Sequence, residues 1–305
     1  MALKITVIGT GYLGATHAAA MAELGFEVIG LDVVPEKIET LRRGEVPMYE
    51  PGLDELLRKH VAGIEGATGR LRFTMDWAEA ADFGDVHFVC VNTPQKHGEN
   101  ACDMSYVDAA MESLAKHLTK PALVVGKSTV PVGSAERIAA RLAELAPAGG
   151  EVELAWNPEF LREGFAVNDT LHPDRIVVGV RSERAEKILR EVYATPVAEG
   201  SPFIVTDFPT AELVKTSANS FLATKISFIN AMAEVCEAAG GDVVKLAEAL
   251  GHDDRIGKKF LRAGIGFGGG CLPKDIRAFM ARAGELGADQ ALTFLREVDS
   301  INMRR

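Results

Sequence analysis

The stretch VIGTGYLG, residues 7–14, decides how the start of this chain folds. Three glycines follow a β-branched apolar run and open a segment of helical character. Glycines at this spacing allow a tight turn between strand and helix, close approach of the backbone to an anion, and close packing of the helix on the strand. The N–H groups at the helix start can bind that anion. The sequence therefore predicts that a dinucleotide pyrophosphate is bound by Gly9, Gly11, Tyr12, Leu13 and Gly14.

Asp32 follows the glycines by about 20 residues and ends the next apolar run. A carboxylate at that position accepts hydrogen bonds from the hydroxyls of the adenosine ribose and repels a 2′-phosphate, so NAD is expected in preference to NADP. Lys37 is a candidate to lie over the adenine or the ribose, although a solvated helix lysine explains it equally well. For the whole motif the alternative is a glycine-rich turn that binds nothing, and the register of strand, turn, helix and acid argues against it.

Short β-branched runs alternate with amphipathic helical stretches from residue 3 to about residue 206: KITVIG, FEVIGLD, VHFVCVN, ALVVGKS, VELAWN, RIVVGV and FIVTD. This alternation is typical of a parallel sheet with helices on both faces, so we expect an α/β, Rossmann-like, doubly wound domain over residues 1–206. From Pro209 the period becomes helical and predicts one helix of roughly 30 residues. An all-helical domain is expected over residues 207–305. Because its long helix is apolar around much of its circumference, we expect it to form the core of a homodimer.

The composition favours a folded protein without a nucleic-acid or membrane partner. Hydrophobic residues make up 47% and charged residues 25% of the 305, enough to bury a sizeable core. The net charge of -10, with no basic stripe, argues against a general nucleic-acid binder. No apolar stretch reaches bilayer-spanning length and no hydrophobic leader precedes KITVIG, so we expect a cytoplasmic location. Four scattered cysteines without a CxxC pair, and histidines without partners, predict no metal site.

Polar residues follow several further strands of the predicted sheet. Thr93 lies in VNTP, and Ser128 and Thr129 lie in KSTVPVG. Ligands of doubly wound folds bind at the carboxyl edge of the sheet, so these hydroxyls are predicted to line the nicotinamide pocket, although helix capping is their commoner use. NPEFLREG follows another strand and carries the carboxylates Glu159 and Glu163. Because this segment follows a strand, its carboxylates are predicted to belong to a ligand-binding site rather than to be solvated surface charges.

Lys215 and Asn219 stand four residues apart in the long predicted helix. They therefore project from one face and can hydrogen-bond the same ligand oxygen, whereas a lone lysine there would be solvated. GIGFGGGCLPKD then places Cys271 at the start of a helix, which makes it a candidate nucleophile. The helix end and Lys274 favour the thiolate while Asp275 disfavours it, so its ionisation is left open. The remaining cysteines are interpreted as core or incidental residues: Cys90, Cys102 and Cys236.

The motifs GTGYLG, VNTP, STVPVG, NPEFLREG, KTSANSFLATKISF and GFGGGCLPKD occur in this order. In this series the chain resembles the UDP-glucose and GDP-mannose dehydrogenase family over nearly its whole length. FLATKISFINAMAE and FGGGCLPKD are most similar to the UDP-glucose members. The resemblance implies oxidation of the sugar C6 alcohol of a nucleotide sugar, UDP-glucose in the first place, to a carboxylate with consumption of two NAD⁺.

The resemblance also implies a role for individual residues. Cys271 attacks the C6 aldehyde after the first hydride transfer, and the thiohemiacetal is oxidised to a thioester that water hydrolyses. Lys215 and Asn219 stabilise the alkoxide and the oxyanions. The residues that position and deprotonate water are Asp275, Glu159 and Thr129, with the general base left open.

Further residues are assigned to ligands by the same resemblance. It puts Glu163 and Lys274 near NAD. The residues expected around the sugar nucleotide are Glu159, Phe160, Leu161, Lys215, Asn219, Arg255, Phe260 and Gly268. Two departures from the family pattern are Phe260, where a tyrosine is frequent, and Gly270, where a serine commonly precedes the cysteine. The loss of each hydroxyl is expected to alter phosphate or loop contacts.

Several alternatives stay open. The substrate can be GDP-mannose or another nucleotide sugar. A single-step β-hydroxyacid dehydrogenase of the 6-phosphogluconate type joins the same two kinds of domain and uses a Lys-x-x-x-Asn pair, but it needs no cysteine. The family also has a third, C-terminal nucleotide-binding domain that lends an arginine to the cofactor site, and we expect that this chain, which ends at Arg305, lacks it. A chain that binds NAD and dimerises without turnover is therefore a further alternative.

Overall fold

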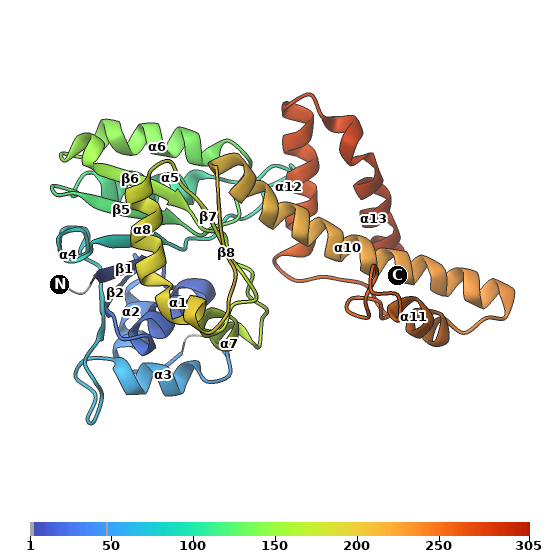
Figure 1. The fold of residues 1–305 in the computed structure, drawn as a ribbon, viewed down its shortest axis with the longest axis horizontal. Helices are drawn as coiled ribbons and strands as arrows, with labels where there is room; N and C mark the ends of the chain where they lie inside the picture. Colours follow the sequence, from blue (N-terminus) through green and yellow to red (C-terminus); the bar gives the residue numbers. More distant parts are fainter. Residues whose placement is uncertain (1–2, 47) are drawn as a thin grey trace. The chain divides into compact units, whose positions relative to one another are not determined.

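The computed structural model describes residues 3–46 and 48–305, and the chain divides into two compact units (Figure 1). The first unit runs up to Thr93 and resumes from Met104 to Glu212, and the second comprises Pro94–Asp103 and Leu213–Arg305. The predicted boundary at residue 206 falls just before a long helix, α10 (Phe208–Ala239), whose first residues belong to the first unit and the rest to the second.

A sheet of eight strands forms the centre of the first unit, in the order β3-β2-β1-β4-β5-β6-β7-β8. Neighbouring strands are parallel except for β6 and β7. The order reverses between β1 and β4, which is where doubly wound folds bind their ligands. The predicted Rossmann-like fold class is confirmed. The strands are β1 (Lys4–Ile8), β2 (Glu27–Leu31), β3 (Leu71–Thr74), β4 (Val86–Val89), β5 (Ala122–Gly126), β6 (Val152–Trp156), β7 (Ile176–Gly179) and β8 (Phe203–Thr206).

Strand β3 is the one that the sequence did not predict. It has four residues, LRFT, and lies at the edge of the sheet, beside β2 only. Its Arg72 is exposed, so the strand lacks the continuous apolar run that marks a central parallel strand. The other strands fall within the seven apolar runs read from the sequence.

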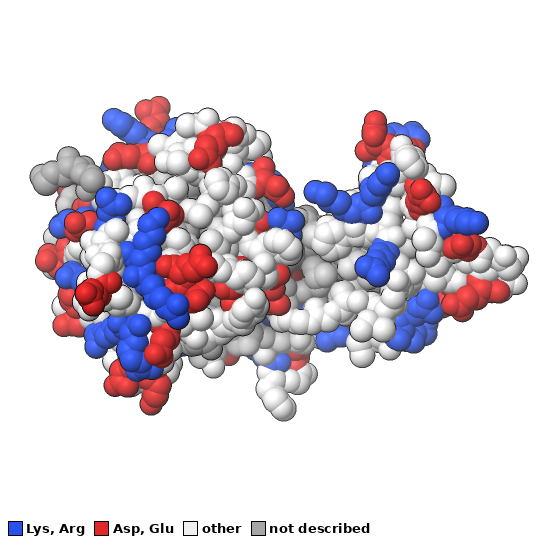
Figure 2. Space-filling view, turned by 90° about the horizontal axis from the view of Figure 1, so that it is seen from below, with Lys and Arg blue, Asp and Glu red and all other residues white. Residues whose placement is uncertain are grey.

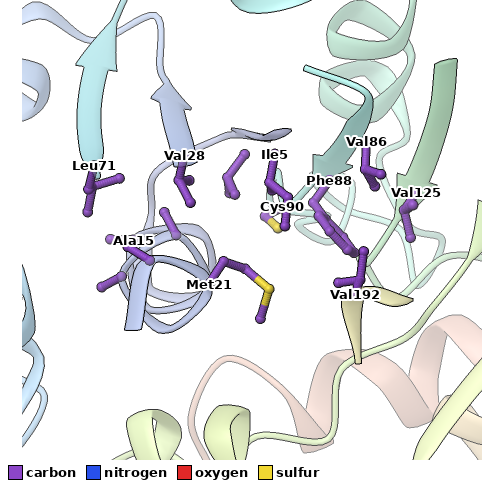
Figure 3. Packing of buried hydrophobic residues seen from close by; sticks show 14 of the residues in the cluster. Ile5, Ala15, Met21, Val28, Leu71, Val86, Phe88, Cys90, Val125 and Val192 are labelled. Atoms are coloured by element: carbon purple, nitrogen blue, oxygen red, sulfur yellow. The ribbon is translucent and has the colours of Figure 1, made fainter. Parts of the chain in front are cut away.

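Helices cover both faces of the sheet, as alternate residues of β1 show. Ile5 and Val7 point to one face and pack in the main hydrophobic core with α1 (Tyr12–Glu23). Thr6 points to the other face, where its hydroxyl donates a hydrogen bond of 2.9 Å to a carbonyl of α4 (Trp77–Phe83). Figure 3 shows part of this core, with Met21 and Ala15 of α1 against the residues of β1, β2 and β4. The remaining helices of the first unit are α2 (Pro35–Arg42), α3 (Leu53–His60), α5 (Ser105–Ala115), α6 (Ser134–Leu145), α7 (Ala166–Leu171), α8 (Glu183–Val192) and α9 (Ala194–Ala198).

The second unit is helical and has a small core of its own. Helix α10 ends at Ala239, which gives it 32 residues, close to the predicted length. Buried residues of α10, α12 and α13 pack together: Ala223, Ile276, Leu295 and Val298. The other helices are α11 (Val243–Gly251), α12 (Leu272–Glu285) and α13 (Thr293–Arg304).

The surface carries both signs of charge. On the face of the first unit shown in Figure 2, basic and acidic side chains are interspersed. Within residues 3–46 and 48–305, no helix is long and apolar enough to span a membrane.

Candidate functional site

Gly9 and Gly14, in the turn between β1 and α1, are required by the packing of the chain itself. Gly9 has a φ of 84°, in the left-handed region that favours glycine. A Cβ atom on Gly14 would lie 1.8 Å from the carbonyl oxygen of Gly9, so a larger residue would force α1 away from the turn. This close approach fixes the start of α1 at the carboxyl end of β1, beside the reversal in strand order.

Gly11 is different, because no atom of the described residues, apart from Gly11 and its neighbours in the chain, lies within 4 Å of the position that its Cβ would take. Its φ of -69° and ψ of -164° are extended backbone open to other residues, so neither strain nor packing explains a glycine there. Gly11 is the N-cap of α1 and offers no side chain to the N–H groups of the first turn, which include those of Tyr12 and Leu13. The open space before these donors fits the pyrophosphate of a dinucleotide.

Asp32 lies directly after β2 and is buried among hydrogen-bond donors. Its Oδ2 accepts hydrogen bonds from the N–H of Thr10 at 2.8 Å and from the Nζ of Lys37 at 2.7 Å, and its Oδ1 accepts one from the N–H of Val34 at 3.2 Å. Burial opposes ionisation, but Lys37 and the backbone N–H groups outweigh it and hold the pKa of Asp32 below its ordinary value. A fixed negative charge at this position suits an unphosphorylated adenosine ribose.

The hydroxyls predicted near the nicotinamide join the loops that follow β4 and β5. Thr93 Oγ1 donates a hydrogen bond to the carbonyl of Thr129 at 2.8 Å, and Ser128 Oγ donates one to the carbonyl of Val91 at 2.6 Å. These bonds hold the two loops together at the carboxyl edge of the sheet. The backbone of Thr129 is therefore fixed by Thr93.

The loop after β6 carries the predicted carboxylates. Glu159 Oε2 accepts a hydrogen bond from the N–H of Leu161 at 2.6 Å, which fixes the side chain within its own loop. The guanidinium of Arg175 lies 3.9 Å from the centre of the Phe160 ring. Glu163 is exposed and directly precedes Gly164, whose φ is 83°.

A buried polar cluster behind this loop was not predicted. Lys127, the last residue before the two hydroxyls, donates a hydrogen bond of 3.0 Å to Asn157 Oδ1, which also accepts one of 2.6 Å from the phenol of Tyr193. Burial and then the nearby Cys90 raise the pKa of Tyr193 far above its ordinary value, so the phenol stays a donor. The lysine of KSTVPVG, standing at the end of an apolar strand, was a signal for this cluster.

A small cavity adjoins the cluster. Its volume is about 50 Å³, and its lining includes His17, Lys127, Glu159, Phe160 and Leu161. Burial, followed by the charge of Lys127, lowers the pKa of His17 well below its ordinary value, so the imidazole is neutral. The cavity has room for water but not for a sugar nucleotide.

In the helical unit, three of the predicted residues of α10 and α12 form a hydrogen-bonded chain: Asn219, Asp275 and Lys274. Asp275, only 2% exposed, accepts a hydrogen bond of 2.6 Å from Asn219 Nδ2 on one oxygen and one of 2.7 Å from Lys274 Nζ on the other. Lys215 is buried one turn before Asn219 on the same helix. The amine of Lys274, the amide of Asn219 and the carboxylate of Asp275 thus lie next to the start of α12, an arrangement suited to stabilising an oxyanion and moving a proton.

Cys271 is the N-cap of α12 and is the one exposed cysteine of the chain, as the four thiols all lie in described residues. Its carbonyl accepts the N–H of Asp275 at 2.9 Å, which closes the first turn of the helix. Three glycines precede it, and no described atom beyond their neighbours in the chain lies within 4 Å of the Cβ positions of Gly268 and Gly270. Cys90, in contrast, is buried, and burial raises the pKa of its thiol to about 12. Of these two thiols, only Cys271 has the exposure that a nucleophile needs.

Two residues expected at the sugar nucleotide have distinct local structures. Arg255 is exposed and forms a two-pronged ion pair with Asp253, at 3.0 and 2.6 Å. Phe260 has a φ of 63°, and it is the only non-glycine residue with positive φ in the described chain. Such backbone strain in a bulky residue is found at ligand sites.

The residues of the two units thus fall into two sets. The first unit holds the glycine turn between β1 and α1, the carboxylate of Asp32 and the loops at the carboxyl edge of the sheet. The second unit holds Cys271 and the hydrogen-bonded chain of Asn219, Asp275 and Lys274. Among the described residues, no group of three or more His, Cys, Asp or Glu side chains is arranged to hold a metal ion.

Sequence comparison agrees with this division. Residues 3–197 match the NAD binding domain of the UDP-glucose/GDP-mannose dehydrogenase family, and residues 209–304 match its central domain. The chain belongs to the UDP-glucose/GDP-mannose dehydrogenase family. The resemblance inferred from the motif series is confirmed.

Three members of the family illustrate the likeness. The UDP-glucose 6-dehydrogenase of Rhizobium meliloti is 44% identical over 283 residues, 92% of this chain and 63% of that protein. A UDP-glucose dehydrogenase structure from Pyrobaculum islandicum gives a TM-score of 0.92 at 40% identity, over 100% of this chain and 68% of that one. The GDP-mannose dehydrogenase of Pseudomonas aeruginosa gives a TM-score of 0.77 at 31% identity, over 99% and 69%. The chain spans 60% to 66% of the length of several curated relatives.

The different roles of two glycines lead to a test. In Gly11→Ala the new methyl group meets no atom of the described residues beyond its neighbours in the chain, so we expect the free energy of unfolding to fall by at most about 1 kcal/mol while the dissociation constant for NAD⁺ rises at least about tenfold. Gly14→Ala is the control, and its clash with Gly9 should lower the stability of the ligand-free protein. Thermal unfolding and calorimetric titration measure both effects. Unchanged NAD⁺ affinity in Gly11→Ala would show that the cofactor does not occupy this space.

Proposed function

We propose that this chain carries the active site of an NAD-dependent dehydrogenase that oxidises the C6 hydroxyl of UDP-glucose to a carboxylate in two steps. The observation that carries the proposal is the placement of Cys271, an exposed thiol at the start of α12, one turn from the buried Asp275. A dehydrogenase that performs a single oxidation has no use for such a thiol. A thiol adjacent to an acid and an ammonium suits covalent capture of an aldehyde.

The names of the relatives support UDP-glucose as the substrate. The protein at 44% identity and the structure with a TM-score of 0.92 are both named as UDP-glucose dehydrogenases, whereas the GDP-mannose dehydrogenase gives 31% identity and a TM-score of 0.77. The proposed site residues around the sugar nucleotide are Glu159, Phe160, Leu161, Arg255, Phe260 and Gly268.

NAD⁺, when bound, accepts one hydride from C6 in each of the two oxidations. The open turn at Gly11 and the carboxylate of Asp32 are the features of this chain that hold it, with Lys37, Thr93, Ser128 and Glu163 as further proposed contacts. The ionised Asp32 accepts the ribose hydroxyls and, by its charge, disfavours NADP.

Cys271 acts between the two oxidations. Its sulfur adds to the C6 aldehyde, and a proton moves to the new alkoxide, which gives a thiohemiacetal. Loss of a hydride and a proton from that adduct gives a thioester. Attack by water breaks the C–S bond, releases the carboxylate and regenerates the thiol. The aldehyde is not released into solution, because the C–S bond holds the C6 carbon in the site between the two oxidations.

Lys215 and Asn219 stabilise the oxygen of the substrate when it carries negative charge. They stand one turn apart on α10, so their side chains project from the same face of the helix. Asn219 is preorganised by its bond to Asp275, which lowers the cost of arranging the donor during the reaction. We assign proton transfer to Asp275, since it is buried beside Asn219 and Lys274, and we assign water positioning to Glu159 and Thr129.

Replacing the nucleophile tests the proposal. In Cys271→Ala we expect formation of the carboxylate to fall by roughly 1,000-fold or more, as for the loss of other enzymatic nucleophiles, with at most one NADH per sugar in a single turnover. Mass spectrometry of the product distinguishes aldehyde from carboxylate. Cys236→Ala, which removes a buried thiol of α10, is the matched control and should keep its turnover. Full turnover with two NADH per sugar in Cys271→Ala would contradict the proposal.

The long helix supports a homodimer as the assembly. Phe221, Phe228 and Val235 are 66%, 45% and 57% exposed and stand seven residues apart, so they form one apolar stripe along α10. Such a stripe is suited to pairing with the same stripe of a second copy about a two-fold axis. The occupant that we propose for it is therefore another chain of this protein.

A charge in the stripe should separate the copies. We expect Phe228→Glu to sediment as a monomer at micromolar concentration, while wild type sediments as a dimer, because the carboxylate would be desolvated in the interface. Ile204→Glu, a like change at an exposed position of β8, is the control and should leave the dimer intact. A Phe228→Glu protein that remains dimeric would place the interface elsewhere.

A further inference from the structure

A buried carboxylate joins three distant segments of the first unit. Glu50 lies between α2 and α3 and is 2% exposed. Its Oε2 accepts the N–H of Gly164 at 2.9 Å, and its Oε1 accepts the N–H of Ala166 at 2.7 Å. A carboxylate is costly to bury unless donors satisfy its oxygens, so these bonds hold the loop after β6 firmly to Glu50.

The same carboxylate oxygen bonds the start of α1. The phenol of Tyr12, the first residue of that helix, donates a short hydrogen bond to Glu50 Oε2, and its oxygen accepts one of 3.1 Å from the N–H of Gly164. Burial and then the bond to Glu50 raise the pKa of Tyr12 well above its ordinary value, so the phenol remains a donor throughout the physiological range. Tyr12 and Gly164 are 152 residues apart in the sequence.

Both ends of this cluster belong to the proposed cofactor site. The backbone of Tyr12 supplies an N–H group at the open turn beside Gly11, and Gly164 directly follows Glu163. The left-handed φ of Gly164, 83°, sets the direction in which the backbone leaves Glu163. A shift of the loop after β6 therefore moves Glu163 and strains the bond to Tyr12, and a shift of Tyr12 loosens the loop.

We propose that Glu50 is a positioning residue of the dinucleotide site: through Tyr12 and the N–H groups of Gly164 and Ala166, it makes the pyrophosphate turn and the Glu163 loop one binding unit. The inference rests on the proposed function, because it takes the turn at Gly11 to bind NAD⁺. Glu50 does not touch the cofactor in this account. It acts on affinity by keeping both sets of contacts formed before the cofactor arrives.

Calorimetric titration with NAD⁺ tests the proposal on wild type, Glu50→Gln, Tyr12→Phe and the double variant. We expect the dissociation constant to rise about tenfold in Glu50→Gln, where an amide cannot accept all the donors, and about fivefold in Tyr12→Phe. In the double variant the dissociation constant should rise by less than the product of the two single-variant rises, since both changes break the same hydrogen-bonded cluster. Asp242→Asn is the matched control: like Glu50, the carboxylate of Asp242 accepts two backbone N–H groups, at 2.8 and 3.3 Å, at the start of α11, and the NAD⁺ affinity of this variant should stay that of wild type.

Hydrogen exchange separates positioning from mere structural support. We expect NAD⁺ to slow exchange of the Gly164 and Ala166 amides in wild type and to leave it unchanged in Tyr12→Phe. A purely structural role would lower the unfolding temperature of the variants without changing their NAD⁺ affinity. That result would overturn the role of Glu50 in positioning but would leave the proposed function standing. Failure of wild type to bind NAD⁺ would overturn the proposed function, and this inference with it.

Discussion

The contact on which the first unit depends is the approach of α1 to the turn before it. The carbonyl oxygen of Gly9 occupies the space that a Cβ of Gly14 would need, at 1.8 Å. With α1 held there, its apolar face covers β1 and β2 in the main core, and its N–H groups open onto the carboxyl edge of the sheet at the strand-order reversal. One steric constraint thus places both a hydrophobic interface and an anion site.

Buried carboxylates are stabilised by nearby hydrogen-bond donors and lysines, although the net charge of the chain is -10. Asp32 is kept ionised by Lys37 and two backbone N–H groups, and Asp275 is held between Asn219 and Lys274. In each case a buried carboxylate has donors on both oxygens, so its position is fixed before a ligand binds. We infer that the protein can bind an anionic cofactor and substrate because these sites present oriented N–H groups and local cations.

The sequence predicted the strands that give apolar runs and the site residues that stand a few positions apart in the chain. Central parallel strands are buried on both faces and give apolar runs, whereas β3, at the edge with an exposed Arg72, gives none. The spacing of Lys215 with Asn219, and of Cys271 with Asp275, is legible because one helix carries each pair. Glu50 was missed since its partner Gly164 is 114 residues away and no local pattern marks it. The hydroxyls of Thr93 and Ser128 were predicted to line the nicotinamide pocket. In the structure both donate hydrogen bonds to backbone carbonyls of the neighbouring loop.

We propose that one thiol, that of Cys271, lets one site perform two oxidations. It is tested most directly by counting NADH released per UDP-glucose consumed by the purified protein, with the sugar product identified in the same sample. The account predicts two NADH for each UDP-glucuronate, with no aldehyde in solution. One NADH per sugar, with an aldehyde or ketone as the product, would contradict the two-step oxidation. It would also mean that Cys271 takes no part in the reaction.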